Sequence, residues 1–180
     1  MNTLRAIPEA MQCNALKGGE GASFISGGRD SMVNMWTAGG DCVGTQAAHR
    51  GSVNFLSDIN CNLKFRGFLG APMMFSLGSD SAIKLWDLKR FKSAGEISMP
   101  TTVTKGVWAG QSIITSGPAG AVTCWNYGRA DVEASASLSL AAPWAGRSLT
   151  CHSAACTDLI SAESFVASSA KNGQILIWQQ

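Results

Sequence analysis

The stretch that decides the fold is "SLGSDSAIKLWDLKRF", residues 76–91, which joins a polar turn to an alternating strand and a Trp-Asp pair. The same order of residues occurs four times without gaps. In each copy a Ser or Thr lies ten residues before a Trp, and an Asp or a weaker substitute lies six before it. The copies are SGGRDSMVNMW (26–36), SLGSDSAIKLW (76–86), TSGPAGAVTCW (115–125) and SSAKNGQILIW (168–178). Such self-similarity indicates an array of supersecondary units.

Each copy predicts a β-hairpin. A short apolar run that ends in Gly or Ser is typical of a buried strand, and a polar turn of the kind that Asp, Asn and Gly favour follows it. The residues between the turn and the Trp then alternate, which is the period of a half-buried strand. Further strands are predicted before the hairpins, at Met11–Leu16, Val53–Ile59, Thr102–Trp108 and Leu149–Ala155, and after them, at Asp41–Gln46, Gly95–Met99 and Ala134–Leu140.

With units of roughly 40 to 50 residues, the chain resembles the WD-repeat β-propeller family. The resemblance covers most of residues 10–180 and implies one all-β domain, a half propeller of about four blades with four strands each. The implied blades are at about 10–47, 48–99, 101–141 and 146–180. The residues that define the first, third and fourth repeats are Ser26, Asp30, Trp36, Thr115, Trp125, Ser168, Asn172 and Trp178.

Blade two matches the family pattern most fully. His49, in "AHRGSV", stands where the family places its Gly-His, and Ser76, Asp80 and Trp86 complete the family's hydrogen-bonded set. The resemblance implies that this set is structural: the Asp accepts from the His, and the Ser links the His to the indole. A buried network of this kind is stable only if every member is satisfied.

The other blades depart from this pattern. Blade one has no Gly-His before its first strand, and blade three has Ala119 in place of the Asp. Blade four has Asn172 there, and its only histidine, His152, falls inside the predicted inner strand.

Closure of the ring is the next question that the resemblance raises. The family usually closes with seven blades, on the order of 300 residues at 40–45 per blade, and an N-terminal strand often completes the last blade. Thr3–Ile7, within 2–7, is the candidate for that closing strand. The chain is interpreted as the C-terminal part of a longer propeller. Completion by blades of another chain, or a small or open ring, are the alternatives.

Composition narrows the function classes. The chain is 46% apolar and 14% charged, and no stretch reaches the length of a membrane span. The N-terminus has no signal-peptide pattern. A net charge of +2 gives little support for a nucleic-acid partner. The cysteines form no Cys-x-x-Cys pair, so we expect reduced thiols, no metal and a cytoplasmic or nuclear location. They are Cys13, Cys42, Cys61, Cys124, Cys151 and Cys156.

Two clusters have the residue types of a catalytic or metal site. His49, Ser76 and Asp80 have the composition of a catalytic triad, but they occupy the family's structural positions and no nucleophile elbow accompanies them. The cluster of Cys151, His152 and Cys156 is interpreted as core or tunnel lining rather than as metal ligands. We therefore expect no enzyme, no catalytic residue and no cofactor.

A non-catalytic scaffold for protein–protein interaction is the predicted function, because repeat arrays present variable loops on a rigid frame. The connections at 60–72 and 87–95 mix basic and aromatic residues and are predicted to share one face, and Trp144 lies outside the repeat phase. The alternative is a module that contacts RNA or anionic lipid through this basic face of blade two. The candidate partner-binding residues are Lys64, Phe65, Arg66, Phe68, Lys89, Arg90, Phe91, Lys92 and Trp144.

Overall fold

The computed structural model describes residues 11–15, 24–58, 73–109, 112–126, 145–162 and 165–179, and every regular element in these ranges is a β-strand. The strands form four antiparallel sheets. The first contains β1 (Met11–Ala15), β2 (Phe24–Gly28), β3 (Met32–Trp36) and β4 (Cys42–Ala47). The second contains β5 (Val53–Asp58), β6 (Met73–Gly78), β7 (Ala82–Asp87) and β8 (Lys92–Ser98).

The third and fourth sheets repeat this plan. The third contains β9 (Lys105–Ala109), β10 (Ser112–Ser116), β11 (Ala121–Asn126) and β12 (Ala145–Thr150). The fourth has three strands in the described residues, β13 (Cys156–Ser161), β14 (Phe165–Ala170) and β15 (Ile175–Gln179). Within each sheet, strands that follow one another along the chain are also neighbours in space.

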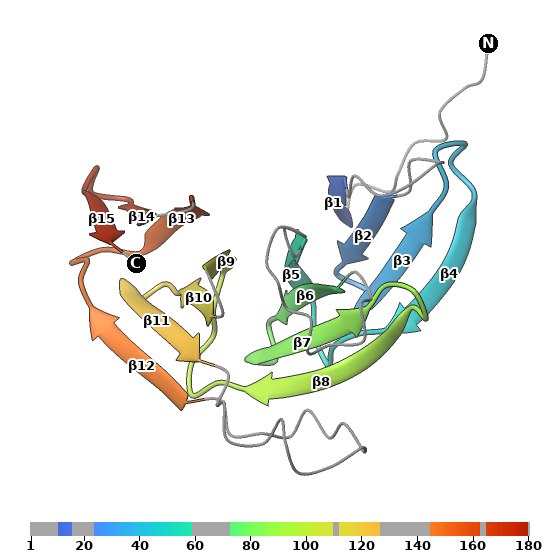
Figure 1. The fold of residues 1–180 in the computed structure, drawn as a ribbon, viewed down its shortest axis with the longest axis horizontal. Coiled ribbons are helices and arrows are strands. Elements are labelled where there is room, and N and C mark those ends of the chain that lie inside the picture. Colours follow the sequence, from blue (N-terminus) through green and yellow to red (C-terminus); the bar gives the residue numbers. More distant parts are fainter. Residues whose placement is uncertain are drawn as a thin grey trace.

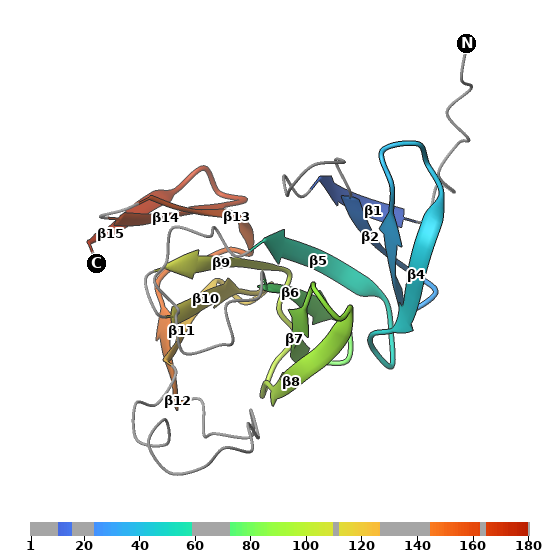
Figure 2. The ribbon, with the colours of Figure 1, turned by 45° about the vertical axis from the view of Figure 1, so that its right-hand side comes forward.

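The four sheets lie along an arc, with β1 to β4 at one end and β13 to β15 at the other (Figure 1). Contacts between sheets join β1 and β2 to β5, β5 to β9, and β9 and β10 to β13, so the first strands of the sheets run along the inner side of the arc (Figures 1 and 2). This is an all-β, β-propeller-like arrangement, as the sequence predicted. The candidate closing strand, Thr3–Ile7, lies outside the described residues.

The turn of each hairpin has a left-handed residue five positions before the Trp. Ser31 and Ser81 have φ angles of 68° and 59°, and Gly120 and Gly173 have φ angles of 75° and 81°. Glycine adopts this backbone without steric cost, whereas serine reaches it with some strain. The common turn explains why the ten-residue spacing between the Ser or Thr and the Trp is constant.

The sheets pack face to face in one repeated orientation. The face that carries the Trp packs against the opposite face of the preceding sheet. In this way Trp86 lies in a cluster with Ile25 and Val33, and Trp125 lies in a cluster with Ile83 and Leu85. Trp178 packs in the same manner against β9 and β10 of the third sheet. This burial of apolar surface holds neighbouring sheets together.

Two predicted strand positions are wrong. The outer strand of the third sheet is β12, which pairs with β11 from Ala121↔Thr150 to Asn126↔Ala145, whereas the sequence placed it at Ala134–Leu140. The predicted blade boundary between 141 and 146 is therefore wrong as well. The inner strand of the fourth sheet is β13, not Leu149–Ala155. Both errors arise because the sequence between β11 and β12 is longer than a hairpin loop. The outer strand of the third sheet therefore occurs later in the sequence than predicted, and so does the inner strand of the fourth sheet.

The inner strand of the third sheet, β9, begins three residues later than its predicted start at Thr102. No helix in the described part of the chain has the length and hydropathy needed to cross a membrane.

Candidate functional site

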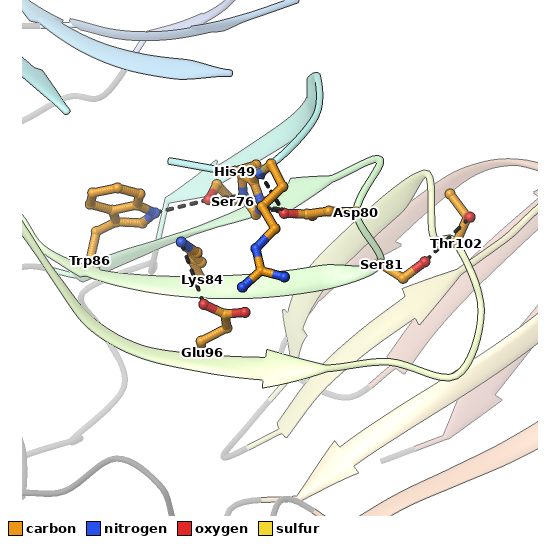
Figure 3. A network of polar contacts seen from close by, with 9 residues as sticks. His49, Ser76, Asp80, Ser81, Lys84, Trp86, Glu96 and Thr102 are labelled. Atoms are coloured by element: carbon orange, nitrogen blue, oxygen red, sulfur yellow. Dashed lines mark hydrogen bonds and ion pairs between the residues drawn. The ribbon is translucent and has the colours of Figure 1, made fainter. Parts of the chain in front are cut away.

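The most extensive polar network in the described residues crosses the second sheet (Figure 3). The indole Nε1–H of Trp86 donates to Ser76 Oγ over 2.9 Å, and Ser76 Oγ lies 2.7 Å from His49 Nε2. His49 Nδ1 lies 3.0 and 3.2 Å from the two carboxylate oxygens of Asp80. The carboxylate also accepts from the backbone N–H of Arg50 over 2.8 Å. The structure therefore brings together the four residues that the sequence predicted as a set.

Burial and local backbone geometry place these groups. Ser76 on β6 and Trp86 on β7 are 0% and 1% exposed, and His49 in the β4–β5 connection is 7% exposed. Asp80 lies in the β6–β7 turn, just before the left-handed Ser81. A side chain at Gly78 would clash with both His49 and Asp80, so glycine is required there for the imidazole to reach the turn.

The network favours neutral His49. Ser76 Oγ accepts from the indole, so its own hydrogen is available to donate to His49 Nε2, while the Nδ1–H donates to Asp80. Burial lowers the pKa of His49 below its usual 6.5, although the Asp80 carboxylate opposes this effect. Burial acts to raise the pKa of Asp80, but the Arg50 N–H and His49 outweigh it and hold that pKa below 3.8. A neutral imidazole beside an ionised carboxylate satisfies every donor in the chain of hydrogen bonds.

The fourth sheet contains a second network that the sequence interpretation missed. His152 lies in the connection between β12 and β13, not inside a strand, and its Nε2 is 2.7 Å from Ser168 Oγ. Trp178 Nε1 donates to the same oxygen over 3.3 Å. His152 Nδ1 lies 3.3 Å from Gln174 Oε1, so an amide replaces the carboxylate. The prediction that this histidine belongs to an inner strand is wrong because that strand begins four residues later, at Cys156.

Asn172 has a different role from Asp80, although both precede their Trp by six residues. Its Nδ2 donates to Ser153 Oγ over 3.0 Å, and its Oδ1 accepts from the backbone N–H of Gln174 over 3.1 Å. The acceptor for the histidine is thus supplied two residues further along the chain, next to the start of β15.

In the described residues of the first and third sheets, the hydrogen bond from the Trp indole to the Ser or Thr hydroxyl is the part of the network that is present. Trp36 Nε1 donates to Ser26 Oγ over 2.8 Å, and Trp125 Nε1 donates to Thr115 Oγ1 over 2.9 Å. Asp30 accepts from the backbone N–H of Met32 over 3.1 Å and so caps its turn. The Trp–Ser or Trp–Thr link is therefore common to all four described sheets, while the histidine occurs in two.

The residues predicted to bind a partner have different environments. Lys64, Phe65, Arg66, Phe68 and Trp144 lie outside the described residues. The remaining basic candidates, Lys89, Arg90 and Lys92, are exposed in or beside the β7–β8 turn. Asp87 organises this turn, because Oδ1 accepts from the backbone N–H of Lys89 and of Arg90, and Oδ2 is 3.3 Å from Arg90 Nη1.

Phe91 is not an exposed anchor, in contrast to the sequence interpretation. It is 9% exposed, belongs to the core between the first two sheets, and stacks on Trp86 with ring centroids 6.3 Å apart. A φ of 50° turns it away from its charged neighbours and toward this core. A Cβ at Gly44 would clash with the Phe91 ring, so the first sheet receives the ring at a glycine.

The cluster around His152 offers little metal-binding chemistry, because both of its ring nitrogens already have partners. Burial raises the pKa of the Cys151 and Cys156 thiols, which disfavours the thiolates that metals bind. No group of three His, Cys, Asp or Glu residues with the spacing of a metal site occurs in the described ranges.

Comparison with known proteins identifies similar folds but does not identify a family. No protein-family model matches the chain, and no curated protein matches it either. Among solved structures, the computationally designed Ika4 protein is similar with a TM-score of 0.71 and 16% identity, over 98% of this chain and 95% of that one. The designed Ika8 protein has a TM-score of 0.65 and 16% identity, over 93% of this chain and 46% of that one.

A chain in a crystal structure of the mitotic checkpoint complex is similar as well, with a TM-score of 0.67 and 15% identity, over 88% of this chain and 45% of that chain. The protein thus spans nearly the full length of one of these structures and less than half of the other two. Identities this low support a shared fold alone.

Proposed function

We propose that the chain is a WD-repeat propeller module and a non-catalytic scaffold for protein–protein interaction. The observation that carries the proposal is the burial of the second sheet's polar set. Ser76 is 0% exposed and is bonded to both Trp86 and His49, so its hydroxyl is committed to the fold instead of facing a substrate. A nucleophile needs an accessible position and donors for an oxyanion. These four side chains therefore have a structural role, and the exposed connections between strands are the part of the chain that we propose to bind a partner protein.

The β7–β8 turn is the binding surface that we propose. Asp87 fixes its backbone with two hydrogen bonds, and the turn presents Lys89 and Lys92 to solvent. A cationic surface on a rigid turn suits an acidic segment of another protein. Similarity to a chain of the mitotic checkpoint complex is in keeping with a protein partner. A cytoplasmic or nuclear location and the absence of a cofactor are parts of the same proposal.

A double charge reversal, Lys89→Glu with Lys92→Glu, tests this proposal. Arg90 is left in place because it is paired with Asp87. The matched control is Arg29→Glu with Lys171→Glu, which makes the same charge change at two other exposed residues. Arg29 lies in the β2–β3 turn of the first sheet, and Lys171 lies in the β14–β15 turn of the fourth sheet. Exposed charges contribute little to stability, so both variants are expected to melt like the wild type.

Affinity purification of the tagged chain, followed by mass spectrometry, is the measurement. We expect the β7–β8 variant to lose partner proteins that the wild type and the control variant retain. An unchanged set of partners in that variant would refute the surface.

Contact with RNA or anionic lipid remains the second candidate, because the same exposed lysines suit phosphate. Binding of a homopolymeric RNA or of phosphatidylserine vesicles, with affinity falling steeply as salt rises, would favour it over a protein partner.

A further inference from the structure

The outer face of the fourth sheet exposes an apolar row. Ile160, Ala167 and Ile177 are paired in register across β13, β14 and β15, so their side chains share one face. Ile160 and Ile177 are 56% and 72% exposed, and Ile175, on the same face of β15, is 67% exposed. Aliphatic side chains gathered in this way on a sheet face are characteristic of a surface that another element covers.

The equivalent positions in the second sheet are buried. Counted back from the Trp, Ile175 corresponds to Ile83, which is 0% exposed, and Ile177 corresponds to Leu85, which is 3% exposed. These residues are covered by the Trp face of the third sheet, where Trp125 belongs to the same cluster. The face of the fourth sheet therefore has the residues of an inter-sheet contact, but no described sheet follows it.

The first sheet has the complementary face. Phe24 and Trp36 stack there with ring centroids 5.9 Å apart, and both are only half buried. Their equivalents in the second sheet, Met74 and Trp86, are each 1% exposed because the first sheet covers them. Among the described residues, no sheet covers the outer face of the fourth sheet and none covers the Trp36 face of the first sheet.

We infer that the outer face of the fourth sheet binds the Trp36 face of the first sheet in a second copy of this chain. The contact continues the packing that already joins sheets one to two, two to three and three to four. In a pair of chains related by a two-fold axis the contact occurs twice and closes the assembly. Coverage of 46% and 45% of two longer similar chains agrees with a complete ring of about twice this length.

The mass of the 180-residue chain, measured by sedimentation over a range of concentrations, tests the inference. The wild type is expected at twice the 18.8 kDa of one chain. Ile177→Glu is expected near 18.8 kDa at the same concentrations, with a dissociation constant raised about 100-fold, because a carboxylate would be buried against apolar side chains. Since Ile177 is exposed in the single chain, the variant is expected to keep the wild-type circular dichroism. Its melting temperature is expected to fall only by the amount that dimerisation adds to the wild type.

Ser93→Glu is the matched control, because Ser93 is also exposed, lies on β8 of the second sheet, and belongs to neither proposed face. It is expected to dimerise like the wild type. A wild type that stays monomeric throughout overturns the inference, and this result would point to covering blades outside these 180 residues. A dimer that Ile177→Glu leaves intact overturns it as well.

A second measurement separates this contact from a fourth sheet packed on another fourth sheet. Hydrogen exchange of the wild type is compared at high and low protein concentration. The proposed contact slows exchange at high concentration in both β3 (Met32–Trp36) and β15 (Ile175–Gln179). Slowing in β15 alone would overturn the assignment of the first sheet as the partner.

Discussion

In the second and the fourth sheet a tryptophan, a serine and a histidine form the same chain of hydrogen bonds, but the acceptor at its end differs. Asp80 accepts from His49 through both carboxylate oxygens and also holds a backbone N–H. Gln174 offers His152 a single amide oxygen at 3.3 Å. The geometry of the indole, hydroxyl and imidazole is therefore preserved while the charged group is replaced.

The surroundings of the two networks account for this tolerance. The second sheet is packed between two others, and Trp86 is 1% exposed. The fourth sheet has three described strands, and although its Trp178 face packs against the third sheet, Trp178 is half buried and Gln174 is exposed. Water can serve as an alternative partner where a group is near the surface, but a buried group without a partner bears its full desolvation cost. The network of the second sheet should therefore contribute more to stability.

Removal of the shared serine is expected to have the largest effect and to differ most between the sheets. Ser76→Ala leaves both the Trp86 indole and His49 Nε2 buried without a partner, which should destabilise the fold by about 2–4 kcal/mol. Ser168→Ala is expected to cost less, about 1–3 kcal/mol, because water reaches the half-buried Trp178, although His152, which is 2% exposed, also loses a partner. Unfolding in urea measures both. Equal losses would show that burial does not set the contribution of the network.

Removal of the acceptor is expected to have the next largest effect. Asp80→Ala deprives His49 and the Arg50 N–H of their partner and should cost about 1–3 kcal/mol. Gln174→Ala should cost less than about 1 kcal/mol, since the amide is exposed. The midpoints of thermal and urea unfolding show which of the two substitutions destabilises the protein more.

Asn172→Ala is the control for this pair, because Asn172 holds only its own turn and Ser153. It is expected to resemble Gln174→Ala. A loss as large as that of Asp80→Ala would mean that the turn, not the histidine, determines the cost.

The four Trp–Ser or Trp–Thr links could be predicted because the hairpin has one constant turn. The two bonded residues are ten positions apart in every sheet. His152 could not be assigned in the same way. It precedes its serine by 16 residues, whereas His49 precedes Ser76 by 27, since the connections between sheets and the first hairpin loops vary in length.

Phe91 and β12 show a second limit of the sequence. Phe91 is flanked by basic residues, which suggested exposure, but its left-handed backbone turns the ring into the core. The strand Ala145–Thr150 is defined by its pairing with β11 rather than by a pattern of its own. Long-range pairing and single backbone torsions both depend on tertiary context, so local periodicity did not indicate either.

Acidification provides the smallest and most specific comparison, because only the second network pairs its histidine with a carboxylate. The pKa of His49 in the folded protein lies below its usual 6.5, so the unfolded chain binds the proton more readily and stability falls as pH drops through about 6.5. Ser76 must also give up its present arrangement when Nε2 acquires a hydrogen. The change in stability is expected to be smaller than that caused by any substitution above, because burial lowers the pKa of His49 while Asp80 raises it.

His49→Gln removes the titrating imidazole and tests whether stability falls or rises on acidification. Urea unfolding of the wild type and the variant is compared from pH about 7.5 to about 5.5, a range in which histidine is the side chain that changes charge. We expect the stability advantage of the wild type to shrink toward the acid end. Asp80 does not complicate this window, because its pKa lies below 3.8, and its own contribution is lost only when pH falls below that value. An advantage that stays constant or grows on acidification would mean that His49 is protonated in the folded protein, with Ser76 accepting from both of its neighbours.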